Sequence, residues 1–188
     1  MSTVRAYQSD DRYLVSLNGI LYTPQVSVCL TIIDNDGNVV SRMEKQPDIF
    51  LSNALKLFLA LVGGFSGLSG TTTAGSLVAI PTTLSVAPTL SIVIGSGSQT
   101  PSATIYALVS TYTSFAAVLS SLAVVNVTST QVVISGSISV TSAVTVSEVG
   151  LLVVTSAGSF LITYDTFSGQ STGTSGGTIT VTVTITFS

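Results

Sequence analysis

Glu148 and Asp165 are the only charged side chains in residues 57–188. Two carboxylates can act as a general acid and a general base, or can hold a cation, and these two fall in neighbouring predicted strands. The chain has no histidine, however, and no third ligand accompanies the pair. The pattern therefore favours a structural role, in which each carboxylate caps backbone N–H groups or makes one hydrogen bond at a loop or subunit contact.

Other residue patterns that could do chemistry are incomplete. Cys29, the single cysteine, lies in the alternating segment VSVCLTII, which predicts a small buried side chain without a base to activate it. Gly173 to Gly177 fit G-x-S-x-G, but a nucleophile elbow needs a following helix and a histidine. Gly95-Ser96-Gly97 lacks the lysine of a phosphate loop. We expect both glycine-rich segments to be turns, and we predict no catalytic residue, no metal site and no cofactor.

Charge is scarce and unevenly placed. Charged residues make up 7% of the chain, against about 25% in an ordinary soluble domain, and serine and threonine supply 57 of its 188 residues. A soluble monomer normally exposes far more charge, so much of this surface is expected to be covered by other copies of the chain. The alternative is a monomer solvated by hydroxyl groups. Five Lys and Arg residues and a net charge of −3 offer no basic face, so we expect no nucleic-acid binding.

Two apolar stretches resemble membrane segments but lack the properties of a spanning helix. Residues 49–62 are too few to cross a bilayer and include Lys56. Residues 107–125 are interrupted by serine and threonine, and their β-branched residues favour strands. The first residues are polar and charged, with no secretory h-region. We expect no membrane span and no export signal.

The chain divides into three predicted segments. Residues 1–46 read as an N-terminal arm and a β-hairpin, in which Val26 to Ile33 alternate and Asp34 to Gly37 form the turn. Residues 47–76 hold the one convincing helix, capped by Asp48 or Ser52 and stopped at Gly63-Gly64, followed by an exposed loop over residues 67–75. Because the helix is apolar nearly all round, it should be buried on most faces. The two segments are expected to pack on the third.

Residues 77–188 read as consecutive short strands. The segments LSIVIGSG, QVVISGSISV, TVSEVGLLVV, SFLITYDTF and TITVTVTITF are rich in Val, Ile, Thr and Phe and are separated by turn residues. Such spacing, with no second helix, predicts a mainly β fold: an antiparallel β-sandwich, jelly-roll or Ig-like, with one buried helix and an N-terminal arm or hairpin. The last strand has no Lys, Pro or other edge protection, so it is either an edge used for assembly or a strand covered within the fold.

The order of several motifs resembles a family of small virion proteins from tailed phages and some archaeal viruses, often described as tail or structural proteins. The resemblance extends over about Asn53 to Ser188. It departs from the family pattern after Leu108, where members of the family often have acidic or arginine residues and this chain has VSTYTSFAAV. The motifs, in order, are SNALKLFLALVGG, IVIGSGSQTPSATIYAL, TVSEVGLLVVTSAGSFLITYDTFSG and GTITVTVTITFS. The resemblance implies a β-sandwich virion component and brings no catalytic residues with it.

Three classes of function follow as expectations. The first is a non-enzymatic virion structural protein that self-assembles into a capsid or tail component, made in the host cytoplasm and bound to itself and to other virion proteins. The second is a subunit of an extracellular filament or surface layer. The third is a glycan-binding module of a fibre, for which Tyr106, Tyr112 and Tyr164 are the candidate contact residues.

Overall fold

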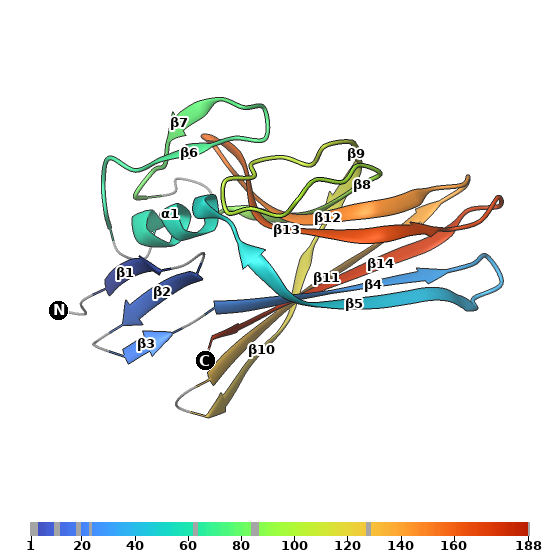
Figure 1. Cartoon of the computed structure of the whole chain (residues 1–188), viewed down its shortest axis with the longest axis horizontal. Helices are drawn as coiled ribbons and strands as arrows, with labels where there is room; N and C mark the ends of the chain where they lie inside the picture. Colours follow the sequence, from blue (N-terminus) through green and yellow to red (C-terminus); the bar gives the residue numbers. More distant parts are fainter. Residues whose placement is uncertain are drawn as a thin grey trace.

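The computed structural model confirms a mainly β architecture with one helix (Figure 1). It describes residues 4–9, 12–17, 20–22, 24–61, 64–83, 87–126 and 129–187, with side chains for residues 24–45, 51–61, 64–83, 87–118 and 131–186. The elements are β1 (Val4–Ser9), β2 (Arg12–Leu17), β3 (Ile20–Tyr22), β4 (Pro24–Ile33), β5 (Val39–Phe50), α1 (Ser52–Leu61), β6 (Ser69–Thr71), β7 (Leu77–Ala79), β8 (Thr89–Gly95), β9 (Thr111–Ala116), β10 (Val118–Asn126), β11 (Ser129–Val140), β12 (Thr145–Thr155), β13 (Gly158–Ser171) and β14 (Gly177–Phe187).

Nine strands form two facing layers, as the predicted antiparallel β-sandwich requires. The hydrogen-bonded order is β10-β11-β14-β4-β5-β13-β12-β8-β9, and every pairing is antiparallel. β5 joins the layers, because its first part pairs with β4 while Ile49 and Phe50 pair with β13 (Figure 1). We call the layer from β10 to β5 the first sheet and the layer from β13 to β9 the second sheet. The chain crosses between them again at Ala117, between β9 and β10.

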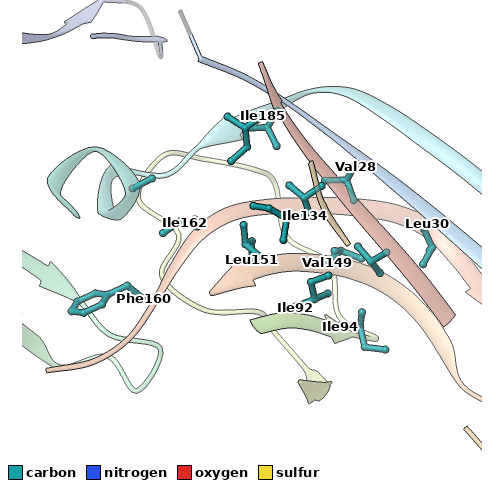
Figure 2. Packing of buried hydrophobic residues seen from close by; sticks show 14 of the residues in the cluster. Val28, Leu30, Ile92, Ile94, Ile134, Val149, Leu151, Phe160, Ile162 and Ile185 are labelled. Carbon is teal, nitrogen blue, oxygen red and sulfur yellow. The ribbon is translucent and has the colours of Figure 1, made fainter. Parts of the chain in front are cut away.

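The core lies between the two sheets. Figure 2 shows Val28 and Ile185 of the first sheet approaching Ile92 and Leu151 of the second. In β4, residues 26, 28, 30 and 32 are buried and their neighbours are half-buried or exposed, so the predicted alternation is confirmed. Burying one such aliphatic side chain contributes about 1.5–3 kcal/mol, which makes this layer the main source of stability.

The final strand lies inside the sheet and not at its edge. β14 pairs with β11 along one side and with β4 along the other. Of the two alternatives raised by its unprotected sequence, coverage within the fold is the one observed. The edges of the nine-stranded order are β9 and β10. Both lie largely within residues 107–125, whose β-branched residues predict strands.

Cys29 differs from its prediction. It is half-buried on the polar face of β4, and its Sγ lies 3.9 Å from the Thr31 hydroxyl. The expected core position is wrong by one residue of the alternation, because Val28 and Leu30 take the buried face and leave Cys29 on the other.

The helix α1 is shorter than the segment that predicted it. Asp48 does not cap it, because Asp48 belongs to β5 and pairs with Val26. The first helical bond instead ends on the Leu51 carbonyl, which accepts from Ala54 N–H at 2.9 Å. At the other end Gly64 takes a positive φ of 67°, as a glycine stop requires, whereas Gly63 lies outside the described residues. Asn53, Ala54, Leu57 and Ala60 are buried, and the other helical residues are half-buried.

The expected loop over residues 67–75 contains a strand. β6 pairs with β7 in a two-stranded hairpin, and Gly70 and Thr72 within it are buried. The buried side chain of Asn53 fastens this hairpin to α1: its Nδ2 donates to the Thr71 carbonyl at 2.8 Å and its Oδ1 accepts from Thr71 N–H at 3.1 Å. The composition of residues 67–75 predicts an exposed loop, but the two hydrogen bonds of the Asn53 amide hold this segment against the helix.

The N-terminal part supplies both a separate sheet and strands of the sandwich. β1, β2 and β3 form a three-stranded antiparallel sheet beside α1, β4 and β5 (Figure 1). The predicted turn between β4 and β5 is confirmed, with Gly37 at a φ of 86°. There the Asp34 carboxylate accepts from Asp36 and Asn38 N–H, and the bond from Asn38 is the main reason that the pKa of Asp34 is lowered.

Candidate functional site

Glu148 is fully buried at the start of β12 and accepts four hydrogen bonds. Its Oε1 accepts from Gly97 N–H at 3.1 Å and from Ser110 N–H at 2.8 Å. Its Oε2 accepts from Val109 N–H at 3.0 Å and from the Tyr164 hydroxyl at 3.2 Å. A buried carboxylate is costly unless its lone pairs are satisfied, and here three backbone amides and a phenol satisfy them.

Gly95 and Gly97 lie so close to the Glu148 carboxylate that neither position leaves room for a Cβ atom. A Cβ on Gly95 would lie 2.6 Å from Glu148 Oε1 and 2.4 Å from the Ser110 carbonyl oxygen. A Cβ on Gly97 would lie 2.7 Å from Glu148 Oε1. The Gly95-Ser96-Gly97 segment therefore owes its composition to close packing around Glu148, and its backbone approaches an anion that belongs to the protein itself.

Tyr164 joins the same cluster from β13. It is buried, donates to Glu148 and accepts from Gln99 N–H at 3.2 Å. Burial, reinforced by the nearby charge of Glu148, raises the pKa of the Tyr164 phenol to about 12. The phenol therefore stays protonated across the ordinary pH range and remains a donor to the carboxylate.

Asp165 forms a different arrangement with Lys45 of β5. Its Oδ1 lies 2.7 Å from Lys45 Nζ and also accepts from Thr166 N–H at 2.7 Å. Lys45 Nζ donates in addition to the Thr166 carbonyl at 2.8 Å. Asp165 is 2% exposed, whereas the Lys45 side chain is 44% exposed, so water reaches only the cation. The other carboxylate oxygen, Oδ2, is buried and has no hydrogen-bond partner among the described residues.

The two carboxylates lie on opposite faces of the second sheet and do not form a common site. Tyr164 and Asp165 are consecutive in β13, and consecutive strand residues point to opposite faces. Tyr164 reaches Glu148 on the outer face, while Asp165 meets Lys45 on the face toward the first sheet. Acid–base work by the pair would need both groups near one substrate atom, and this geometry separates them.

The outer face of the second sheet carries its own small core beneath the loop of residues 97–110. The loop is tied to Glu148, to Tyr164 and, through the Ala103 carbonyl, to Ser52 N–H at the start of α1. Two buried side chains of the loop pack with five others beneath it: Ile105 and Leu108 with Leu51, Val93, Leu152, Leu161 and Tyr164. The internal anion thus positions a loop that covers apolar surface.

The loop also bounds a surface hollow of about 410 Å³. Tyr106 at its side is exposed and lies near Gly75 of the β6–β7 turn. The lining residues are uncharged: Gln99, Ser102, Thr104, Ile105, Tyr106, Ala107, Leu108 and Val109. Of the three tyrosines considered for glycan contact, Tyr106 and Tyr112 are exposed, while the buried Tyr164 is excluded.

The sequence did not reveal what surrounds either carboxylate. The backbone donors to Glu148 come from positions 51, 39 and 38 residues away in the chain and the Tyr164 hydroxyl from 16 residues away, and no local pattern links them. The sequence contained only one signal, the two glycines of Gly95-Ser96-Gly97. They indicated a turn, but not that the Glu148 carboxylate packs against it.

The chain matches no protein-family model, and neither a curated protein nor a solved structure is significantly similar to it. Within the part of the chain that the structure describes, no helix has the length and apolar character needed to cross a membrane.

Proposed function

We propose that this chain is a non-enzymatic structural protein of a virion. In this proposal it self-assembles into a capsid or tail component through contacts of the sandwich, the helix and the N-terminal arm. It is made in the host cytoplasm, resides in the virion, and binds other copies of itself and other virion proteins. The motif order from Asn53 to Ser188 supports the virion assignment by resemblance.

One observation carries the assembly part of the proposal. Residues 57–188 contain two charged side chains, Glu148 and Asp165, and both are buried. The surface contributed by these residues therefore presents no charged side chain to solvent. Soluble monomers rely on mixed surface charge for colloidal stability, and a neutral surface of this extent is suited to burial between subunits.

Electron microscopy of the purified full chain tests the proposal. Rings, tubes or shells of uniform diameter are the expected result, and their symmetry would indicate which virion component the protein forms. Single small particles at every concentration examined would contradict self-assembly.

A glycan-binding module is the second candidate, supported by the hollow beside Tyr106. An exposed aromatic ring next to hydroxyl and amide groups suits the apolar and polar faces of a neutral sugar. Tyr106→Ala should abolish retention on an immobilised glycan while Tyr112→Ala leaves it intact. Absence of retention by the unmodified chain on neutral glycans would remove this candidate. The remaining expectation, an extracellular filament or surface-layer subunit, predicts filaments in the same images.

A further inference from the structure

β9 is the outermost strand of the second sheet. It pairs with β8 on one side, and among the described strands it has no partner on the other. The one irregularity in this ladder falls at its Gly95 end, so residues 113–116 form a regular antiparallel pair with β8. In such a pair alternate backbone N–H and C=O groups point away from the partner strand. Toward the Thr111 end these groups form a free edge that another strand can use, whereas at the other end the Ala116 carbonyl oxygen lies close to Gly136 of β11.

Exposed apolar side chains occur in β9 and in the residues that flank it in the sequence. Tyr106, Val109, Tyr112 and Val118 are each at least 44% exposed and lie within thirteen residues of one another in the chain. The described side chains include only four other large apolar groups with comparable exposure, and these are spread over residues 39–77. Of the four, Tyr112 belongs to β9, Tyr106 and Val109 precede it in the 97–110 loop, and Val118 begins β10. An exposed apolar side chain on an edge strand gains free energy when it is covered.

The edge lacks the charged residues and the proline by which many sheet edges resist pairing, and its one irregularity lies at the Gly95 end. Natural edges are protected by lysine, proline or an inward charge. No charged residue occurs between Lys56 and Glu148, and β9 contains no proline. Its sequence, TYTSFA, is also rich in the β-branched and aromatic residues that pair well.

We propose that the β9 edge binds the β9 edge of a second copy of this chain, antiparallel, so that the second sheet continues across a two-fold axis. A strand that pairs antiparallel with itself supplies its own donors and acceptors, and the neutral sequence creates no like-charge repulsion between copies. The symmetry places side chains of the same face opposite each other. Tyr112 therefore lies across from Ser114 or Ala116 of the second copy. This inference deepens the proposed self-assembly and rests on it.

The test places lysines on the edge and leaves the core untouched. Tyr112→Lys/Ser114→Lys changes two exposed side chains of β9, and Val39→Lys/Leu77→Lys adds the same charge at two exposed apolar positions elsewhere. The masses of the full-length variants are measured by light scattering, and circular dichroism checks that both fold. We expect the β9 variant to fall to half the assembled mass or less, down to the 19.2 kDa chain, while the control keeps the mass of the unmodified protein.

A cross-linking experiment identifies the occupant. Ser114→Cys in a Cys29→Ser background, treated with a short thiol cross-linker that spans about 8 Å, should give a covalent dimer. The two residues 114 lie about 4.5–5.5 Å apart if Tyr112 faces Ala116, and about 7–8 Å apart, on the diagonal, if Tyr112 faces Ser114. Val39→Cys in the same background should give none.

The outcomes separate this inference from the proposed function. If the β9 lysine variant assembles like the unmodified chain, the β9 edge is wrong and self-assembly stands. If the unmodified chain is monomeric at all concentrations, self-assembly itself is contradicted. If Ser114→Cys does not cross-link and deletion of residues 1–22 abolishes assembly, a neighbour's N-terminal strand occupies the edge and the β9–β9 pairing is overturned.

Discussion

Glu148 organises the outer face of the second sheet from a single buried position. Three amides of the 97–110 loop converge on it, and the loop in turn covers the apolar residues beneath. A charge in such a place is useful only if it keeps all its donors, because an amide left facing another donor inside the protein costs about 1–3 kcal/mol. Glu148 is therefore a structural residue whose conservative replacement should be damaging.

Replacing Glu148 by glutamine should lower the free energy of unfolding by about 2–3 kcal/mol. Glutamine keeps the shape but puts an NH₂ group where Gly97, Ser110 or Val109 presents a donor. Urea unfolding measures the change, and amide hydrogen exchange should show faster exchange at these three residues. Ser147→Ala, one position earlier, is the control and should change stability by less than about 0.5 kcal/mol. Equal stability of Glu148→Gln and the unmodified protein would contradict this structural role of Glu148.

The ion pair between Asp165 and Lys45 should show coupling in a double-mutant cycle. Lys45→Met leaves a buried carboxylate without its cation and should cost about 1–3 kcal/mol, less than for a fully buried pair because Lys45 is partly exposed. Adding Asp165→Asn removes the charge and should restore part of the loss. Strictly additive effects of the two substitutions would show that the pair contributes no coupling energy.

We predict that the folded protein loses stability at high pH because the Tyr164 phenol ionises. The pKa of its phenol is about 12 in the folded state and 10.0 in an ordinary environment, so folding favours the protonated form. Its contribution is complete below about pH 10 and is lost as the pH rises through about 12. Absorbance titration should reveal one tyrosine that ionises near pH 12 and not near the ordinary value of 10.0. Tyr164→Phe should remove that late step, and its persistence in this variant would assign it to another residue.

At the scale of elements, most strands of the sandwich core were predictable and their pairing partners were not. The alternation of β4 and β14 and the apolar runs of β8, β11, β12 and β13 appear directly in the sequence because each strand buries one or both faces. Which strand becomes an edge depends on pairing between distant segments. That is why the unprotected β14 proved to be central, while β9 lies at the edge.

Two local errors have the same physical origin. The loop over residues 67–75 contains β6 because Asn53 binds Thr71, a contact that composition does not encode. Asp48, a reasonable helix cap by type, is held in β5 by pairing with Val26. In both cases a tertiary contact outweighs a local preference of the chain.

The N-terminal sheet should be dispensable for folding of the sandwich. β1, β2 and β3 pair only with one another among the described strands, and they lie outside the nine-stranded order. Deleting residues 1–22 should therefore leave a cooperatively unfolding sandwich with a nearly unchanged circular dichroism spectrum per strand residue. If the arm also exchanges between subunits, the same deletion should lower the assembled mass. Loss of cooperative unfolding would show that the arm belongs to the core.

For the whole molecule, the important property is that residues 57–188 expose no charged side chain to solvent. The two carboxylates of residues 57–188 serve internal bonds, and hydroxyl groups supply the remaining polar surface. Contacts between such surfaces contain no acidic or basic side chain and therefore no ion pair. Acid and salt should therefore have little effect on them.

Assembly should accordingly be insensitive to pH and ionic strength. We expect the same particle mass between about pH 3 and pH 7 and between about 0.05 M and 1 M salt, a range over which exposed ion pairs are strongly screened. Light scattering measures the mass, and circular dichroism at each condition separates dissociation from unfolding. Dissociation of folded subunits on acidification or in high salt would show that charged residues of the first 56 positions hold the assembly together.

The most direct test of the central claim is the solution mass of the purified full chain over a wide range of concentrations. If the uncharged surface of residues 57–188 is buried by self-assembly, light scattering should give a defined multiple of 19.2 kDa that persists on dilution. A mass of 19.2 kDa at every concentration, from a folded protein that stays in solution, would contradict the account.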